Sequence, residues 1–147
     1  KVGWWKNGYP EYFAKVLNAP NWIGINVFVN GEQLDLNKCS KIEGFRRELN
    51  MKEGWYQRSF KATLKNGIEI SVKSTRFLSL DIDEVGAIKY EVTPLSSSAK
   101  ILFESYLDSG IENHDTNWEE KFWETLDIHH EGNQAVIVAR TLKTHFY

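Results

Sequence analysis

The sequence has little cysteine, proline and methionine, and it has no long hydrophobic run. A single cysteine, Cys39, stands among its 147 residues, which excludes an internal disulfide framework. No stretch approaches the roughly 20 apolar residues of a membrane-spanning helix, and no segment has the layout of a signal peptide. The sequence also lacks an Asn-x-Ser/Thr glycosylation acceptor. We therefore expect a cytoplasmic chain with no membrane partner.

The charge of the sequence is nearly balanced. Lysine and arginine number 18 against 20 acidic residues, for a net charge of −2. A chain with this balance has no broad positive field that would attract a polyanion. We expect no nucleic-acid partner.

Helical periodicity persists nowhere, and short alternating runs take its place. The segment 22–30 places Ile23, Ile25, Val27 and Val29 on one face, as a half-buried strand does. Asn30-Gly31 and Asn66-Gly67 are each expected to form a tight hairpin turn with two positive φ values. A weaker turn is expected at 52–54. The expected strands are 22–30, 33–36, a strand ending near residue 51, 55–64, 68–75, 84–94, 100–107 and 134–140.

This spacing of strands and turns predicts an all-β fold, a two-sheet antiparallel β-sandwich. A length of 147 residues suits a single domain, 1–147. The strand 134–140 is apolar on both faces, which predicts a place between two layers. The segment 1–21 is expected to be an irregular lead-in. Because the sequence stops at Tyr147 with no closing turn after an apolar strand, we expect a fragment of a larger sandwich domain.

The polar residues do not form a convincing catalytic pattern. Asp81, Asp83 and Glu84 fall between strands, where acids are typical of a solvated turn. His129 and His130 are adjacent on an expected strand, so their rings point to opposite faces and do not share one ion. Cys39 has no motif around it. We therefore assign no catalytic residue, no metal site and no cofactor.

The arginines have two possible uses. No glycine-rich loop is present that would point backbone N–H groups at a phosphate. Holding an anion through arginine side chains stays open as one use, and surface salt bridges are the use that we expect. The residues concerned are Arg46, Arg47, Arg58 and Arg76.

The segment 108–121 is the best candidate for a role beyond packing. Loops of about 14 residues without periodicity are usually functional or disordered. A second cluster of acids lies in and just after this segment, next to aromatic rings: Glu112, Asp115, Glu119, Glu120 and Glu124. Two interpretations stay open: contact with a ligand or neighbouring domain, or packing of the rings on the second sheet. The candidate substrate or interface residues are Asn113, Asp115, Trp118, Phe122 and Trp123.

Four segments carry a resemblance to a known family. They read APNWIGINVFVNGEQLDL at 19–36, FRRELNMKEGW at 45–55, STRFLSLD at 74–81 and HDTNWEEKFW at 114–123. In these segments the chain resembles the amino-terminal domain of glycoside hydrolase family 65, the maltose phosphorylase group. The resemblance implies a large sandwich of the kind found in galactose mutarotase, and here a piece of it.

The resemblance also implies what the whole enzyme does. Such enzymes convert an α-linked glucose disaccharide and phosphate, for example maltose, to β-glucose 1-phosphate and glucose. Their general acid and phosphate site belong to an (α/α)6 barrel that follows the sandwich, so no catalytic residue is carried over to 1–147. The implied partners are that barrel in the same chain and a second copy in a homodimer. The sequence does not say which disaccharide is used.

A second function stays open. A free-standing carbohydrate-binding sandwich would explain the 14% of aromatic residues, since rings stack on sugars. Such a module is expected to close its own sheets at both ends. The length of the natural reading frame distinguishes it from a piece of a phosphorylase.

Overall fold

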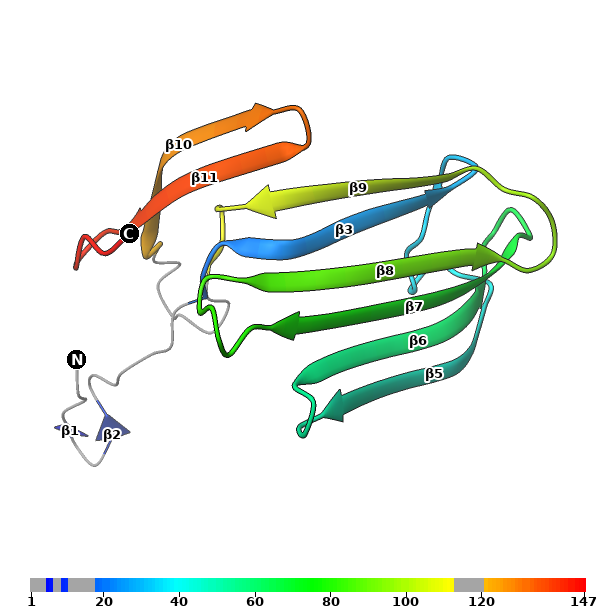
Figure 1. Cartoon of the computed structure of the whole chain (residues 1–147), viewed down its shortest axis with the longest axis horizontal. Coiled ribbons are helices and arrows are strands. Elements are labelled where there is room, and N and C mark those ends of the chain that lie inside the picture. The colour runs from blue at the N-terminus through cyan, green and yellow to red at the C-terminus, as the bar shows by residue number, and fades with distance from the viewer. Residues whose placement is uncertain (1–4, 7–8, 11–17, 113–120) are drawn as a thin grey trace. The chain divides into compact units, whose positions relative to one another are not determined.

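The structure, a computed structural model, describes residues 5–6, 9–10, 18–112 and 121–147. Every regular element in these residues is a β-strand (Figure 1). The predicted all-β class is therefore confirmed. None of the described segments is a helix long and apolar enough to cross a membrane. The chain divides into two compact units, one of Ile25–Ser105 and the other of Lys1–Gly24 with Tyr106–Tyr147.

A four-stranded antiparallel sheet lies within the first unit. Its order along the sheet is β5 (Lys41–Asn50), β6 (Trp55–Thr63), β7 (Glu69–Leu78) and β8 (Gly86–Pro94). Figure 1 shows them as neighbouring arrows coloured teal to green. Consecutive strands are joined by short turns and pair in sequence order. The sheet is thus a meander, as the alternation of 55–64 and 68–75 predicted.

A second sheet has the order β4 (Glu32–Gln33), β3 (Asn21–Val29) and β9 (Ile101–Asp108). The Asn30 N–H donates to the Lys100 carbonyl at 2.9 Å, and the Asn26 side-chain amide donates to the Glu104 carboxylate at 3.3 Å. Because residue numbers rise along β3 as they fall along β9, these two strands are antiparallel.

The predicted strand 33–36 is wrong in its bounds. The strand ends at Gln33. The Leu34 N–H still donates to the Val27 carbonyl at 2.8 Å, and the chain then turns around Asp35. The Asp35 side-chain carboxylate accepts from the Asn37 N–H at 2.9 Å. The Asp35 backbone carbonyl accepts from the Lys38 N–H at 2.9 Å. Side chains of aspartate that bond to the backbone two residues on compete with a sheet ladder.

The core of the first unit lies between these two sheets. In β3, β6 and β7 every second side chain points into the space between the sheets. The side chains that form the core there are each at most 3% exposed. Burying apolar side chains is the main favourable contribution to folding, at about 25 cal/mol per Å². The two layers make this unit an antiparallel β-sandwich, as predicted. The buried residues are Val27, Val29, Phe60, Ala62, Leu64, Ile70 and Val72.

The two Asn-Gly turns differ in type. Asn30 and Gly31 both have positive φ, at 50° and 84°, and form the expected two-residue turn. At the other turn only Gly67 is positive, at 81°. The Gly67 N–H donates to the Leu64 carbonyl at 3.0 Å, and the Leu64 N–H donates to the Ile68 carbonyl at 3.0 Å. This is a three-residue loop with glycine in the left-handed position, so the expectation of two positive φ values was wrong there.

The carboxylate of Glu32 joins the two turns. Its two oxygens accept from the N–H groups of Lys65 and Asn66, each at 2.9 Å. The Asn66 side-chain amide reaches the Val29 carbonyl at 3.4 Å. Bonds to the backbone therefore favour the three-residue form of the second turn.

In the second unit, β10 (Trp123–Glu131) and β11 (Gln134–Thr141) form an antiparallel hairpin. A short ladder also joins β1 (Trp5–Lys6) to β2 (Tyr9–Pro10), within the segment expected to be irregular. The predicted strand 134–140 is confirmed. Its expected place between two layers is not, because Ala135 and Val136 are exposed and 137–139 are only half-buried.

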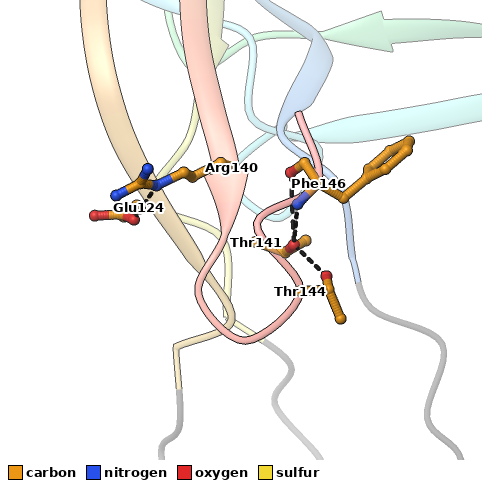
Figure 2. A network of polar contacts seen from close by, with 5 residues as sticks. All are labelled: Glu124, Arg140, Thr141, Thr144 and Phe146. Atoms are coloured by element: carbon orange, nitrogen blue, oxygen red, sulfur yellow. Dashed lines mark hydrogen bonds and ion pairs between the residues drawn. The ribbon is translucent and has the colours of Figure 1, made fainter.

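The chain turns back on itself after β11, where we had expected no closing turn. The His145 N–H donates to the Thr141 carbonyl at 3.0 Å, and the Thr141 N–H donates to the Phe146 carbonyl at 2.9 Å. The Phe146 N–H in turn donates to the Thr141 hydroxyl at 2.9 Å (Figure 2). A threonine side chain that bonds to the nearby backbone stabilises such a turn, and sequence alternation does not reveal it.

Candidate functional site

The five residues proposed from the sequence fall in two groups. Asn113, Asp115 and Trp118 lie outside the described residues. Phe122 and Trp123 are described, and both are half-buried. The Trp123 indole N–H donates to the Asn18 carbonyl at 2.7 Å, and the Phe122 carbonyl accepts from the Leu142 N–H at 2.9 Å. These bonds anchor both residues within their own unit. A binding role for the five stays a prediction.

The two sides of the segment 113–120 are held together where the structure describes them. The Lys121 ammonium lies 3.4 Å from the Glu112 carboxylate. The Thr125 hydroxyl donates to the Ser109 hydroxyl at 2.7 Å. Exposed ion pairs contribute little, about 0–1 kcal/mol, so the Lys121–Glu112 pair adds little to this stem.

Glu124, from the second acidic cluster, is paired across the hairpin. Its carboxylate accepts from the Arg140 guanidinium, in a directly opposed pair of β10 and β11 (Figure 2). The hydrogen bond that Arg140 donates to Glu124 raises the pKa of the Arg140 guanidinium, and Tyr147 adds to that effect. Glu124 therefore has a structural contact within its own hairpin.

The first acidic cluster forms a solvated turn, as the sequence predicted. Asp81, Asp83 and Glu84 are exposed in the connection between β7 and β8. The Ser79 hydroxyl accepts from the N–H groups of Asp81 and Ile82, at 3.2 and 2.9 Å. In the part of the chain that is described, no three His, Cys, Asp or Glu side chains lie close enough to hold a metal ion.

Cys39 is half-buried and packs against the core. Its thiol lies 3.3 Å from the Asp35 carbonyl, and desolvation raises its pKa, with Glu32 and Asp35 adding to the effect. A thiol with a raised pKa stays protonated and is a weak nucleophile. Cys39 therefore has the contacts of a small hydrophobic residue.

A cavity of about 130 Å³ opens between the two sheets of the first unit. Ligand sites usually have about 300–1,000 Å³, so this one is too small for a disaccharide. Arg58 is the one charged residue in its lining. The lining residues are Ile25, Val27, Leu34, Leu36, Arg58, Phe60 and Tyr90.

Arg47, Arg58 and Arg76, the arginine row, lie on the inner face of the four-stranded sheet. Arg47 is directly opposite Arg58 on β5 and β6, and Arg76 is opposite Tyr56 on β6 and β7. Each guanidinium covers an aromatic ring. The distances to the ring centres are 5.1 Å for Arg47 over Phe45, 5.7 Å for Arg58 over Phe60 and 4.8 Å for Arg76 over Tyr56.

The row was missed by the sequence analysis, which expected salt bridges. That expectation is confirmed for Arg46, whose guanidinium lies 2.6 Å from the Glu48 carboxylate. For Arg47, Arg58 and Arg76 no ion pair to a described acid is found, and each meets an aromatic ring. The signal was the alternation Tyr56, Arg58, Phe60, which places these side chains on the core face.

Comparison with known proteins identifies the class to which this sandwich belongs. The family model for the glycosyl hydrolase family 65 N-terminal domain matches residues 1–147. The chain belongs to this family, as its motifs indicated. It is 42% identical to maltose phosphorylase of Bacillus subtilis over 99% of the chain and 19% of the relative.

Two further relatives are named as phosphorylases of other sugars. Alpha,alpha-trehalose phosphorylase of Thermoanaerobacter brockii is 32% identical over 94% of the chain and 20% of the relative. Kojibiose phosphorylase of the same organism is 36% identical over 67% of the chain and 13% of the relative. The chain spans about a fifth or less of the length of these relatives.

Proposed function

We propose that residues 1–147 form a non-catalytic part of the amino-terminal domain of a disaccharide phosphorylase. The carrying observation is the match to maltose phosphorylase over 99% of this chain but 19% of the relative. In the proposed protein the reaction of maltose with phosphate yields β-glucose 1-phosphate and glucose. The catalytic residues lie in a barrel that this segment does not include.

The described chemistry of the chain agrees with a supporting role. Inverting cleavage of a glycosidic bond needs two carboxyl groups about 6.5–9.5 Å apart across the bond. Asp81 and Asp83 lie in an exposed turn, and Glu124 is paired with Arg140. We propose that the sandwich packs against the barrel, contributes to a dimer, and brings the segment 108–123 near the barrel or its pocket.

Activity assays on two proteins test this proposal. The purified chain 1–147, incubated with maltose and phosphate, should release no glucose 1-phosphate. The longer natural protein that carries it should release glucose 1-phosphate from maltose faster than from trehalose or kojibiose.

An inactive preparation made in the same way controls for contaminating enzyme. Release of glucose 1-phosphate in proportion to purified chain 1–147 would contradict the non-catalytic role. A longer protein with no phosphorolytic activity on any of the three sugars would contradict the proposed reaction.

A further inference from the structure

Within the unit Ile25–Ser105, the inner face of the four-stranded sheet is covered over only part of its length. Phe60 and Val72 face the second sheet and are at most 3% exposed. Farther along the same sheet, Leu49 on β5 is 65% and Leu78 on β7 is 66% exposed. Both belong to the same face, since Leu49 is opposite Tyr56 and Leu78 lies six residues beyond Val72 in the alternation. The apolar core surface therefore continues beyond its cover.

The arginine row crosses this open part of the face. Arg47 and Arg58 are direct neighbours across β5 and β6, an arrangement in which like charges destabilise a sheet. The rings below them offset part of that repulsion through cation–π contact. No described acid forms an ion pair with any of the three, so the positive charge of the row has no counterpart within the described chain.

We propose that the arginine row and the apolar side chains around it dock a polypeptide segment that carries carboxylates beside apolar residues. The guanidiniums form charge-assisted hydrogen bonds with the carboxylates, often in bidentate geometry. Apolar side chains of the segment cover Phe45, Leu49 and Leu78, and one of them enters the cavity beside Arg58.

The chemistry of the face favours a polypeptide over a small anion. Phosphate would engage the guanidiniums but would leave the exposed leucines in water. Interfaces between proteins are enriched in arginine and aromatic residues, which is the composition found here. The source that we assign is the part of the longer chain outside 1–147, because this chain spans 19% of the length of maltose phosphorylase. This assignment rests on the proposed function.

Arginine modification in the longer natural protein tests the docking. Phenylglyoxal reacts with accessible guanidiniums, and peptide mass spectrometry gives the rate at each arginine. Arg46 is the matched control, since it neighbours Arg47 in sequence but points to the opposite face and is largely exposed. We expect Arg47, Arg58 and Arg76 to react at least about tenfold more slowly than Arg46, because a docked segment excludes the reagent.

The competing occupants have distinct outcomes in the same experiment. Protection that appears only when inorganic phosphate is added would assign the row to a small anion. Protection that is lost on dilution would assign it to a second copy of the chain. If Arg47 reacts as fast as Arg46, no segment covers the arginine row. Each of these results would overturn the proposal. Each can be measured whether or not the protein phosphorolyses maltose, so a failure of the docking is distinguishable from a failure of the proposed function.

Substitution gives an independent measurement. The variant Arg47→Gln, Arg58→Gln, Arg76→Gln should expose the inner face of the longer protein, so amides of β5 and β6 exchange at least about tenfold faster with deuterium. Arg46→Gln should leave exchange unchanged. Equal exchange in the two variants would contradict the docking. If the triple variant does not fold, the modification rates of the unchanged protein still decide.

Discussion

The hairpin of β6 and β7 and the hairpin of β10 and β11 are alike in pairing and differ in burial. Each has two antiparallel strands of 8–10 residues and a short turn with a glycine at positive φ. The first hairpin contributes Phe60, Ala62, Ile70 and Val72 to a core in which each is at most 3% exposed. The second contains no fully buried side chain.

Ile70 and Ile128 are the clearest pair for this comparison. Both are isoleucines within a paired strand, yet Ile70 is 0% and Ile128 is 66% exposed. Backbone pairing therefore does not decide burial. A strand side chain is buried when another layer covers its face, and the pairing ladder forms with or without that cover.

Truncating these two isoleucines should give the largest difference in stability between the two hairpins. Ile70→Ala should destabilise the purified chain by about 2–5 kcal/mol, because it removes buried contacts and leaves a cavity. Ile128→Ala should change the free energy of unfolding by at most about 0.5 kcal/mol, because its side chain is largely in water. Urea unfolding of the two variants measures both effects. Equal losses would mean that Ile128 is buried in solution.

A smaller effect is expected at the turn of the first hairpin. Gly67→Val should destabilise the chain by about 1–2 kcal/mol, since a β-branched residue at a φ of 81° is strained. No atom lies within 4 Å of the position of an added Cβ, so the cost comes from the backbone conformation and not from a clash.

Gly67→Asn is the control for that variant. Asparagine tolerates the left-handed region better than valine does, so its melting temperature should lie between those of the parent and of Gly67→Val. A melting temperature of Gly67→Val equal to that of the parent would contradict the turn geometry.

The smallest effect concerns the turn after β4. The Asn37 N–H and the Lys38 ammonium hold the pKa of the Asp35 carboxyl below its ordinary value of 3.8. A lowered folded-state pKa means that the stabilisation is present above pH 3.8 and is lost as the pH falls below it. Melting temperatures from pH 6 to pH 2 should therefore decline more for the parent than for Asp35→Asn. Parallel declines would show that Asp35 makes no pH-dependent contribution.

The sequence predicted more of the strands than of the site. Alternation located β3, β6, β7, β8, β9 and β11 to within a few residues, because side-chain direction repeats every two residues in any strand. The beginning of β10 at Trp123 was not predicted: from the sequence Trp123 is a candidate interface residue, and only His129 and His130 are placed on an expected strand. Of the proposed site residues, Asn113, Asp115 and Trp118 lie outside the described residues.

Two errors have a shared cause. The type of the turn at Gly67 depends on the Glu32 carboxylate, which is 33 residues away from Lys65 in sequence. The arginines of the row took aromatic partners where carboxylates were expected, because Arg47, Arg58 and Arg76 lie on the core face of the sheet. In both cases the fold decides: Glu32 reaches the turn from another strand, and the core face of the sheet carries rings but no described ion-pair partner beside these arginines.

The amino-acid sequence by itself determined the all-β class, the hairpin positions and the family, because these depend on local alternation, turn residues and motifs. Only the tertiary structure decided which apolar faces are buried and which arginines lack an acidic partner among the described residues. Burial depends on whether a second layer lies over a face, and the layer that covers a strand can come from any part of the chain. That relation is not local in sequence, and so the open inner face with its arginine row was visible only in the folded chain.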